Sequence, residues 1–198
     1  MKHLYRYLAT LVLSLLAPAV WAFDLEALAR QLSQAPVARG TFEQHKALRA
    51  LPVPLVSRGR FTLARDHGLL WHLQQPIAQY YRITPNGLWR QTTQGWQEEG
   101  NSTAAHHNRL FLAVLAGDTD RLQENFDLTL QGRPDAWQLT LQPKGLLLRQ
   151  IFTSIDIQGG DTVERIALHE TQGDTTRLQL WTEETADALN ATEHDDFR

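Results

Sequence analysis

Along most of this 198-residue chain, side chains alternate between apolar and polar, and this period of two constrains the fold more than any other feature. Successive side chains of a β-strand point to opposite faces, so the alternation predicts strands with one buried face. Turn residues such as Pro85-Asn86-Gly87 separate the stretches. We expect one antiparallel meander, mainly β, curved into a barrel or a strongly bent half-barrel. Its ten or eleven strands are predicted at 39–48, 57–64, 69–74, 80–84, 88–93, near Trp96, 126–131, 137–142, 151–157, 163–170 and 176–182.

Two segments break the alternation and predict helices. Asp24 can cap an N-terminal helix that extends to Gln34 and has leucines at helical spacing on one face. Residues 108–116 are helical in composition and almost free of polar side chains, and Gly117 suits the end of such a helix. A helix that is apolar nearly all round must be buried, so this one is expected to cover the mouth of the curved sheet. It either fills the core permanently or swings away to admit a hydrophobic ligand, and the pattern leaves both readings open.

The first residues predict a secretory signal. Two cations precede an uncharged apolar run at residues 8–20, and Val20-Trp21-Ala22 offers small residues to a signal peptidase. The run is too short to span a bilayer, which needs about 20 apolar residues. We therefore expect residues 1–22 to be a cleaved signal peptide and the mature protein, from Phe23, to be soluble in the periplasm. A buried N-terminal helix is the alternative.

Composition limits the remaining possibilities. The chain has no Cys, which excludes disulfides, a thiol nucleophile and thiolate metal sites. Acidic residues crowd residues 183–198, which we expect to be a flexible tail after a single domain at 23–182. The rest is close to neutral without a basic stripe, so no nucleic acid is expected as partner.

Two arrangements suggest other chemistry. His106-His107 could bind a metal, but adjacent histidines point in different directions and no third ligand stands nearby at metal-like spacing. Ser154 and scattered histidines could form a hydrolytic triad, but no Gly-x-Ser-x-Gly turn occurs. We therefore expect neither a metal nor another cofactor, and no enzymatic activity.

Several motifs together resemble the periplasmic outer-membrane lipoprotein carrier family, the LolA-type chaperones. Gly40-Thr41-Phe42-Glu43-Gln44-His45-Lys46 is similar to the family's first strand. The spacing from Gly59 through Arg65 to Trp71 and Pro76 is the most specific part. The resemblance covers nearly the whole chain after residue 22, and it implies an incomplete, half-open β-barrel of about eleven strands with an N-terminal helix and a helical lid.

The resemblance also implies roles for individual residues. Arg65 matches the arginine that bonds lid-helix carbonyls and holds the empty carrier closed, which suits a guanidinium near a helix C-terminus. Without the resemblance, Arg65 would be an exposed strand-end arginine and the strand aromatics would be core. With it, the lid helix includes Leu110, Phe111, Val114 and Leu115, and the cavity is lined by Phe42, Phe61, Leu63, Trp71 and Leu73.

The implied function is a monomeric carrier that shields the acyl chains of lipoproteins, or of another lipid-like cargo, between an inner-membrane transporter and an outer-membrane acceptor. The chain departs from the family's pattern in an apolar, proline-bearing stretch between Lys46 and Ser57 and in its acidic end. Both departures concern the cargo and partners more than the fold. The alternatives are a periplasmic lipid-binding sensor domain without a transport role and an acyl hydrolase.

Overall fold

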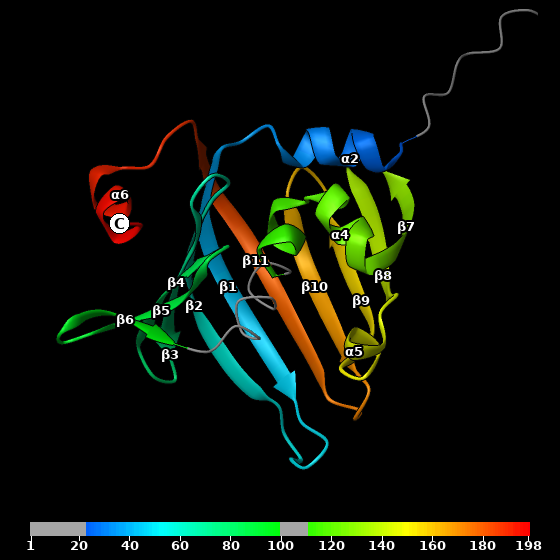
Figure 1. Ribbon diagram of the computed structural model, residues 1–198, viewed down its shortest axis with the longest axis horizontal. Coiled ribbons are helices and arrows are strands. Elements are labelled where there is room, and N and C mark those ends of the chain that lie inside the picture. The colour runs from blue at the N-terminus through cyan, green and yellow to red at the C-terminus, as the bar shows by residue number, and fades with distance from the viewer. Residues whose placement is uncertain (1–22, 100–110) are drawn as a thin grey trace, which may run out of the picture.

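One antiparallel sheet of eleven strands forms the body of the protein, as the computed structural model shows for residues 23–99 and 111–198 (Figure 1). The strand order is β6-β5-β4-β3-β2-β1-β11-β10-β9-β8-β7. Every neighbouring pair is consecutive in sequence except β1 and β11, which join the two ends of the chain. In the described residues the sheet is not closed into a barrel: β6 and β7 are its edges, and the chain between them carries helices. The half-open, mainly β fold is confirmed.

The strands are β1 (Val37–Ala47), β2 (Leu55–Ala64), β3 (Gly68–Gln75), β4 (Gln79–Thr84), β5 (Gly87–Thr92), β6 (Gly95–Glu99), β7 (Phe126–Arg133), β8 (Ala136–Pro143), β9 (Phe152–Gly159), β10 (Val163–Glu170) and β11 (Thr175–Ala186). The helices with both ends described are α2 (Leu25–Leu32), α4 (Thr119–Asn125), α5 (Leu146–Arg149) and α6 (Ala191–Asp196). Residues 111–116 are also helical and are called the roof segment below.

Two glycines allow the central strands to bend. A β-carbon at Gly40 would lie 1.9 Å from the Trp181 carbonyl oxygen, and one at Gly59 would lie 2.0 Å from that of His72. The register shifts beside both glycines, between Arg39 and Gly40 and between Arg58 and Gly59. Such irregularities bend a strand and increase its twist, so they curve the sheet where the core aromatics lie.

The hydrophobic core lies between the inner face of the sheet and the helices that cover it. Asp24 accepts a hydrogen bond from the Ala27 amide at 2.8 Å and caps α2, as predicted. Leu28 of α2 and Leu122 of α4 are fully buried against the inner side chains of the strands. Because the strands alternate, every second residue faces this core and the others face outward.

The C-terminal end differs from the expected flexible tail at 183–198. Strand β11 continues to Ala186, and α6 follows with a capping box between Asn190 and Glu193. Glu193 is buried, and both of its carboxylate oxygens accept hydrogen bonds from Arg39, each at 2.6 Å. This acidic residue therefore fixes α6 to the outer face of the sheet. There α6 covers Leu70, which is only 2% exposed.

None of the helices in residues 23–99 and 111–198 is long and apolar enough to cross a membrane. The predicted signal peptide at 1–22, His106-His107 and Leu110 lie outside the described residues. The short helix α5 was not predicted.

Candidate functional site

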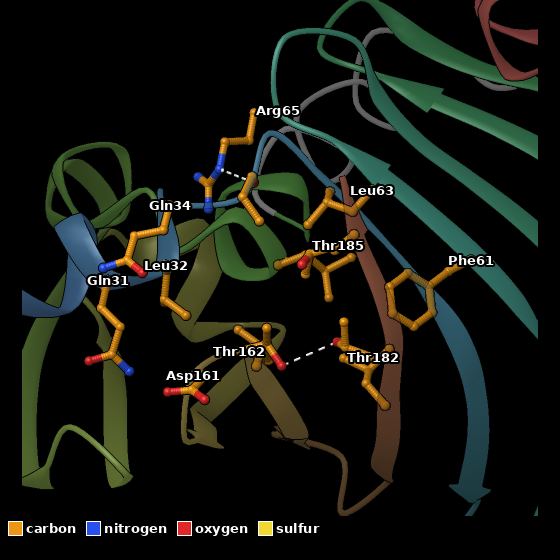
Figure 2. Close-up of a pocket in the computed structure, with 15 residues that line it drawn as sticks. Gln31, Leu32, Gln34, Phe61, Leu63, Arg65, Asp161, Thr162, Thr182 and Thr185 are labelled. Atoms are coloured by element: carbon orange, nitrogen blue, oxygen red, sulfur yellow. Dashed lines mark hydrogen bonds between the residues drawn. The ribbon is translucent and has the colours of Figure 1, made fainter. Parts of the chain in front are cut away.

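A cavity of about 410 Å³ lies between α2, the roof segment and strands β1, β2 and β11 (Figure 2). Its lining is amphipathic. The apolar part comprises Leu32, Ala35, Ala38, Phe61, Leu63, Leu115, Val163 and Leu180. The polar part comprises Gln31, Gln34, Arg65, Asp161, Thr162, Thr182 and Thr185.

Arg65 lies directly after β2 and joins the sheet to the roof segment and to the connection between α2 and β1. Its Nε donates to the Ala35 carbonyl oxygen at 3.0 Å, and Nη1 donates to that of Ala116 at 2.9 Å. Its backbone amide donates to the Pro36 carbonyl oxygen at 3.0 Å. Ala116 is the last helical residue of the roof segment, where unpaired carbonyls and the helix dipole favour a cation. The geometry therefore matches the position expected for a closing arginine.

The Arg65 side chain is partly buried, which lowers its pKa, while the charges of Asp66 and Asp118 oppose this lowering. The guanidinium stays charged at any physiological pH, because an arginine side chain is not deprotonated in proteins. Its two carbonyl contacts are thus charge-assisted hydrogen bonds in a partly dry environment, where such bonds are stronger than at an exposed surface.

The roof segment packs as an all-apolar helix must. Val114 is 3% exposed and belongs to the core, and Leu115 contributes to the cavity wall. Gly117 ends the segment with a positive φ of 64°, and a β-carbon there would lie 2.3 Å from Leu32 Cδ1 of α2. The roof segment and α2 are therefore in direct contact. Leu110, the other expected lid residue, lies outside the described residues.

Helix α2 is anchored to the opposite wall of the cavity through Gln31. Its side-chain amide donates to the carbonyl oxygens of Pro134 at 2.9 Å and Gly160 at 2.7 Å. The Gly160 carbonyl also accepts from the Trp137 indole at 2.7 Å. Because Gln31 reaches two turns of the sheet while the roof segment is held by Arg65 and packing, α2 is the more firmly attached half of the roof.

The residues expected to line a cavity fall into two groups. Phe61 and Leu63 border the 410 Å³ cavity. Phe42 and Trp71 are instead stacked on each other in the core, and Phe111 of the roof segment meets Trp71 edge-on at 6.0 Å between ring centroids. Leu73 is partly buried beside this cluster. The expected lining and lid residues other than Leu110 thus share one apolar interior, but only some of them reach the cavity.

Sequence reasoning missed the polar wall. The Thr162 and Thr182 hydroxyls are 3.2 Å apart and hydrogen-bonded across the cavity floor, as Figure 2 shows, with Asp161 beside them. A threonine in a strand or an aspartate in a turn gives no local signal of facing a cavity. Leu28 and Leu32 of α2 are buried, as their helical spacing predicted, and Leu32 also borders the cavity.

The described residues contain no group of three or more His, Asp or Glu that could hold a metal ion. The histidines that lie near carboxylates, such as His169 with Nε2 3.2 Å from Asp156 Oδ2, are on the outer face of the sheet. The cavity itself offers hydroxyl, amide and guanidinium groups beside an apolar wall. This arrangement suits binding of an amphipathic molecule.

Comparison with solved structures finds similar chains at low sequence identity, with TM-scores below 0.5. A LolA superfamily protein from Nitrosomonas europaea is 10% identical, with 85% of this chain and 94% of that chain covered and a TM-score of 0.47. MucB in the MucA/MucB complex of Pseudomonas aeruginosa is 15% identical, with 85% and 58% covered and a TM-score of 0.48. LppX from Mycobacterium tuberculosis is 11% identical, with 83% and 98% covered and a TM-score of 0.42.

A search of curated proteins gives no significant match. The sequence model of the family described as outer membrane lipoprotein carrier protein LolA, in contrast, matches residues 33–194, which is most of the chain and includes β1 to β11. The roofed half-barrel and the position of Arg65 agree with the resemblance read from the sequence. The chain therefore belongs to the LolA family of outer membrane lipoprotein carrier proteins, as a divergent member.

Proposed function

We propose that this protein is a periplasmic carrier that takes up the acyl chains of a lipoprotein or of another lipid-like cargo and moves them from the inner to the outer membrane. Residues 1–22 would direct its export, an inner-membrane transporter would load it, and an outer-membrane acceptor would unload it. It would act as a monomer and without catalysis.

The observation that carries the proposal is an apolar interior covered by α2 and the roof segment, with few polar attachments of the roof segment among residues 23–99 and 111–198. The cavity of about 410 Å³ falls within the range of about 300–1,000 Å³ that is typical of ligand sites. Acyl chains gain free energy when they leave water for such an interior. The closed cavity is small for several chains, so loading requires the roof segment to move and expose the core behind it.

The way in which the roof segment is attached explains why its movement costs little free energy. Arg65 supplies the two side-chain bonds described above, to Ala35 and Ala116. Only the bond to Ala116 holds the roof segment, and one charge-assisted bond contributes about 1.5–3 kcal/mol to the closed state. Cargo that buries several methylene groups in the opened interior recovers more than this, at about 0.8 kcal/mol for each group. The closed state therefore protects the empty interior without preventing uptake.

The polar wall would receive the less apolar end of the cargo. Thr162, Thr182 and Asp161 lie across the cavity from Leu63 (Figure 2). Hydroxyl and carboxylate oxygens accept hydrogen bonds from amide or amine groups, which a purely hydrocarbon ligand lacks. We therefore favour a cargo whose acyl chains are linked to a hydrogen-bonding head, such as the acylated N-terminus of a lipoprotein.

Site-specific photo-cross-linking tests the proposal. A benzophenone amino acid replaces Phe61, which borders the cavity, in cells that also produce a triacylated lipoprotein. Trp181 is the matched control, because it is also aromatic and lies on β11, two strands from β2 in the sheet, but is 49% exposed on the outer face. Cross-linking to the lipoprotein at 61 and not at 181, lost when the acylated cysteine of the lipoprotein is replaced, is the expected result. Cross-linking only to a non-acylated protein would instead indicate a sensor or regulatory domain.

A further inference from the structure

We propose that the end of the sheet opposite α2 is a docking surface for a bilayer with anionic headgroups. This end is formed by the β1–β2 loop, the β3–β4 turn and α5, and is called the apolar end below. The proposal concerns a surface outside the cavity, so it holds or fails independently of what the cavity binds.

The exposed large apolar side chains gather at this end. Among the described residues, every such side chain except Trp181 belongs to one of its three connections. They are Leu51, Val53 and Leu55 around the β1–β2 loop, Ile77 in the β3–β4 turn, and Leu146 and Leu147 in α5. Val53, Ile77, Leu146 and Leu147 are each more than two-thirds exposed. Single exposed leucines are common, but a set confined to one end of a molecule indicates a contact surface.

The register of the sheet places the three connections together. Lys46 pairs with Leu55 and Ala47 with Thr175, so the β1–β2 loop and the β10–β11 turn lie at the same end (Figure 1). Arg58, near the start of β2, pairs with Gln75 at the end of β3, which brings the β3–β4 turn to that end as well.

Hydrogen bonds connect the β1–β2 loop to α5 through the β10–β11 turn. The Arg49 amide donates to Asp174 Oδ1 at 2.8 Å, and the Thr171 hydroxyl donates to the Gln150 carbonyl oxygen, directly after α5, at 2.6 Å. The apolar side chains are therefore held on connected backbone segments. Because these segments are already ordered, the apolar end can enter a headgroup layer without the entropy cost of ordering a flexible loop.

The apolar end and the opposite end of the sheet differ in the charged residues that their connections carry. The three connections, residues 47–54, 76–78 and 144–151, contain no Asp or Glu and carry Arg49, Lys144 and Arg149. The connections at the opposite end carry Asp66, Asp135, Asp161 and Asp187. The β10–β11 turn at the same end adds Asp174, and Lys144 Nζ lies 3.5 Å from Asp127 Oδ1, so Arg49, Lys144 and Arg149 exceed these acids but do not exclude them. A surface that combines exposed apolar side chains with an excess of cations is complementary to an anionic bilayer, and the acidic opposite end is repelled by one. A protein partner would require shaped pockets, whereas this end presents protruding side chains.

The test uses the complete chain, which contains no Cys, so that a single introduced cysteine carries the only label. An environment-sensitive nitrobenzoxadiazole dye is attached at Val53→Cys or at Leu147→Cys. Asn86→Cys, exposed in the β4–β5 turn at the opposite end, is the matched control. All three proteins contain residues 1–22, so any membrane affinity of that segment is common to them.

Vesicles of phosphatidylcholine with and without phosphatidylglycerol are then added. We expect a blue shift and a several-fold rise in emission at positions 53 and 147 with the anionic vesicles, quenching by nitroxide lipids, and no change at position 86. No response at 53 and 147, an equal response at 86, or an equal response to uncharged vesicles overturns the proposal. Adding Val53→Asp to the Leu147→Cys protein should weaken vesicle binding about tenfold. Unchanged binding in that variant, with an intact near-ultraviolet circular dichroism spectrum, also overturns it.

Discussion

Replacing Arg65 by leucine tests whether this side chain controls the opening of the roof. The change removes the bonds to the Ala35 and Ala116 carbonyls, at 3.0 and 2.9 Å, and leaves a shorter, apolar side chain. A hydrogen bond to a charged group contributes about 1.5–3 kcal/mol. Only the Ala116 bond reaches the roof segment, and because Arg65 is only partly buried we take the lower value, a loss of about 1.5 kcal/mol in the closed state. The opening equilibrium should then rise by about tenfold.

Hydrogen exchange measures this opening directly. Amides of residues 111–118 should exchange faster by about the same factor in Arg65→Leu, since exchange requires the roof segment to detach. A fluorescent fatty-acid probe should bind more tightly, because opening of the roof segment lowers its apparent affinity less in this variant. Arg65→Lys keeps the charge but presents a single ammonium group, so it should give an intermediate rate.

The control and the refuting results are equally specific. Arg133→Leu removes an exposed arginine, 74% accessible, whose ion pair is with Asp135 in a turn, and it should leave residues 111–118 unaffected. Unchanged exchange in Arg65→Leu would refute the closing role. Faster exchange across the whole sheet would show that Arg65 stabilises the fold in general and does not specifically hold the roof.

Three further changes address the roof and the C-terminal helix. Leu115→Asp should abolish fatty-acid binding, because an unpaired carboxylate would face the apolar cavity wall. The near-ultraviolet circular dichroism spectrum of the folded protein should persist, and retained fatty-acid binding would contradict this placement of Leu115. Gly117→Val should lower the melting temperature and loosen the roof segment, because a β-carbon there would collide with Leu32 and φ is positive; an unchanged melting temperature would contradict this. Glu193→Gln should destabilise the docking of α6 by about 2 kcal/mol, measured by hydrogen exchange of residues 191–196, since the ion pair with Arg39 is lost. Glu193 has its pKa lowered chiefly by the Arg39 hydrogen bond, so in the wild type this stability is full above pH about 4.5 and is lost as pH falls through the lowered pKa. A wild-type protein whose α6 detaches equally at pH 7 and pH 3 would refute the role of the pair.

The sequence of β3 contains a local signal for the C-terminal helix α6 that the sequence analysis did not use. Leu69, Leu70 and Trp71 are consecutive and all buried, although an alternating strand buries only every second residue. Such a run predicts cover on both faces of β3, and α6 supplies the outer cover over Leu70. The acidic composition of residues 183–198 favoured a solvated tail only because the partner of Glu193, Arg39, lies 154 residues earlier in the chain.

The sequence alone determined the elements whose signals are local. Alternation of apolar residues predicted the strands, and Asp24 and Gly117 marked helix ends, because these features depend on neighbours within a few residues. Arg65 was found through a spacing of residues along the chain. Its two acceptors, however, belong to separate segments of the chain, and only the fold brings them together.

Tertiary structure alone decided the pairing of β1 with β11, the polar wall of the cavity, the docking of α6 and the gathering of apolar loops at one end. Each of these depends on contacts between residues far apart in the chain, such as Val37 with Ala186. The free energy of such contacts comes from burial and complementary charge, which no window of neighbouring residues contains.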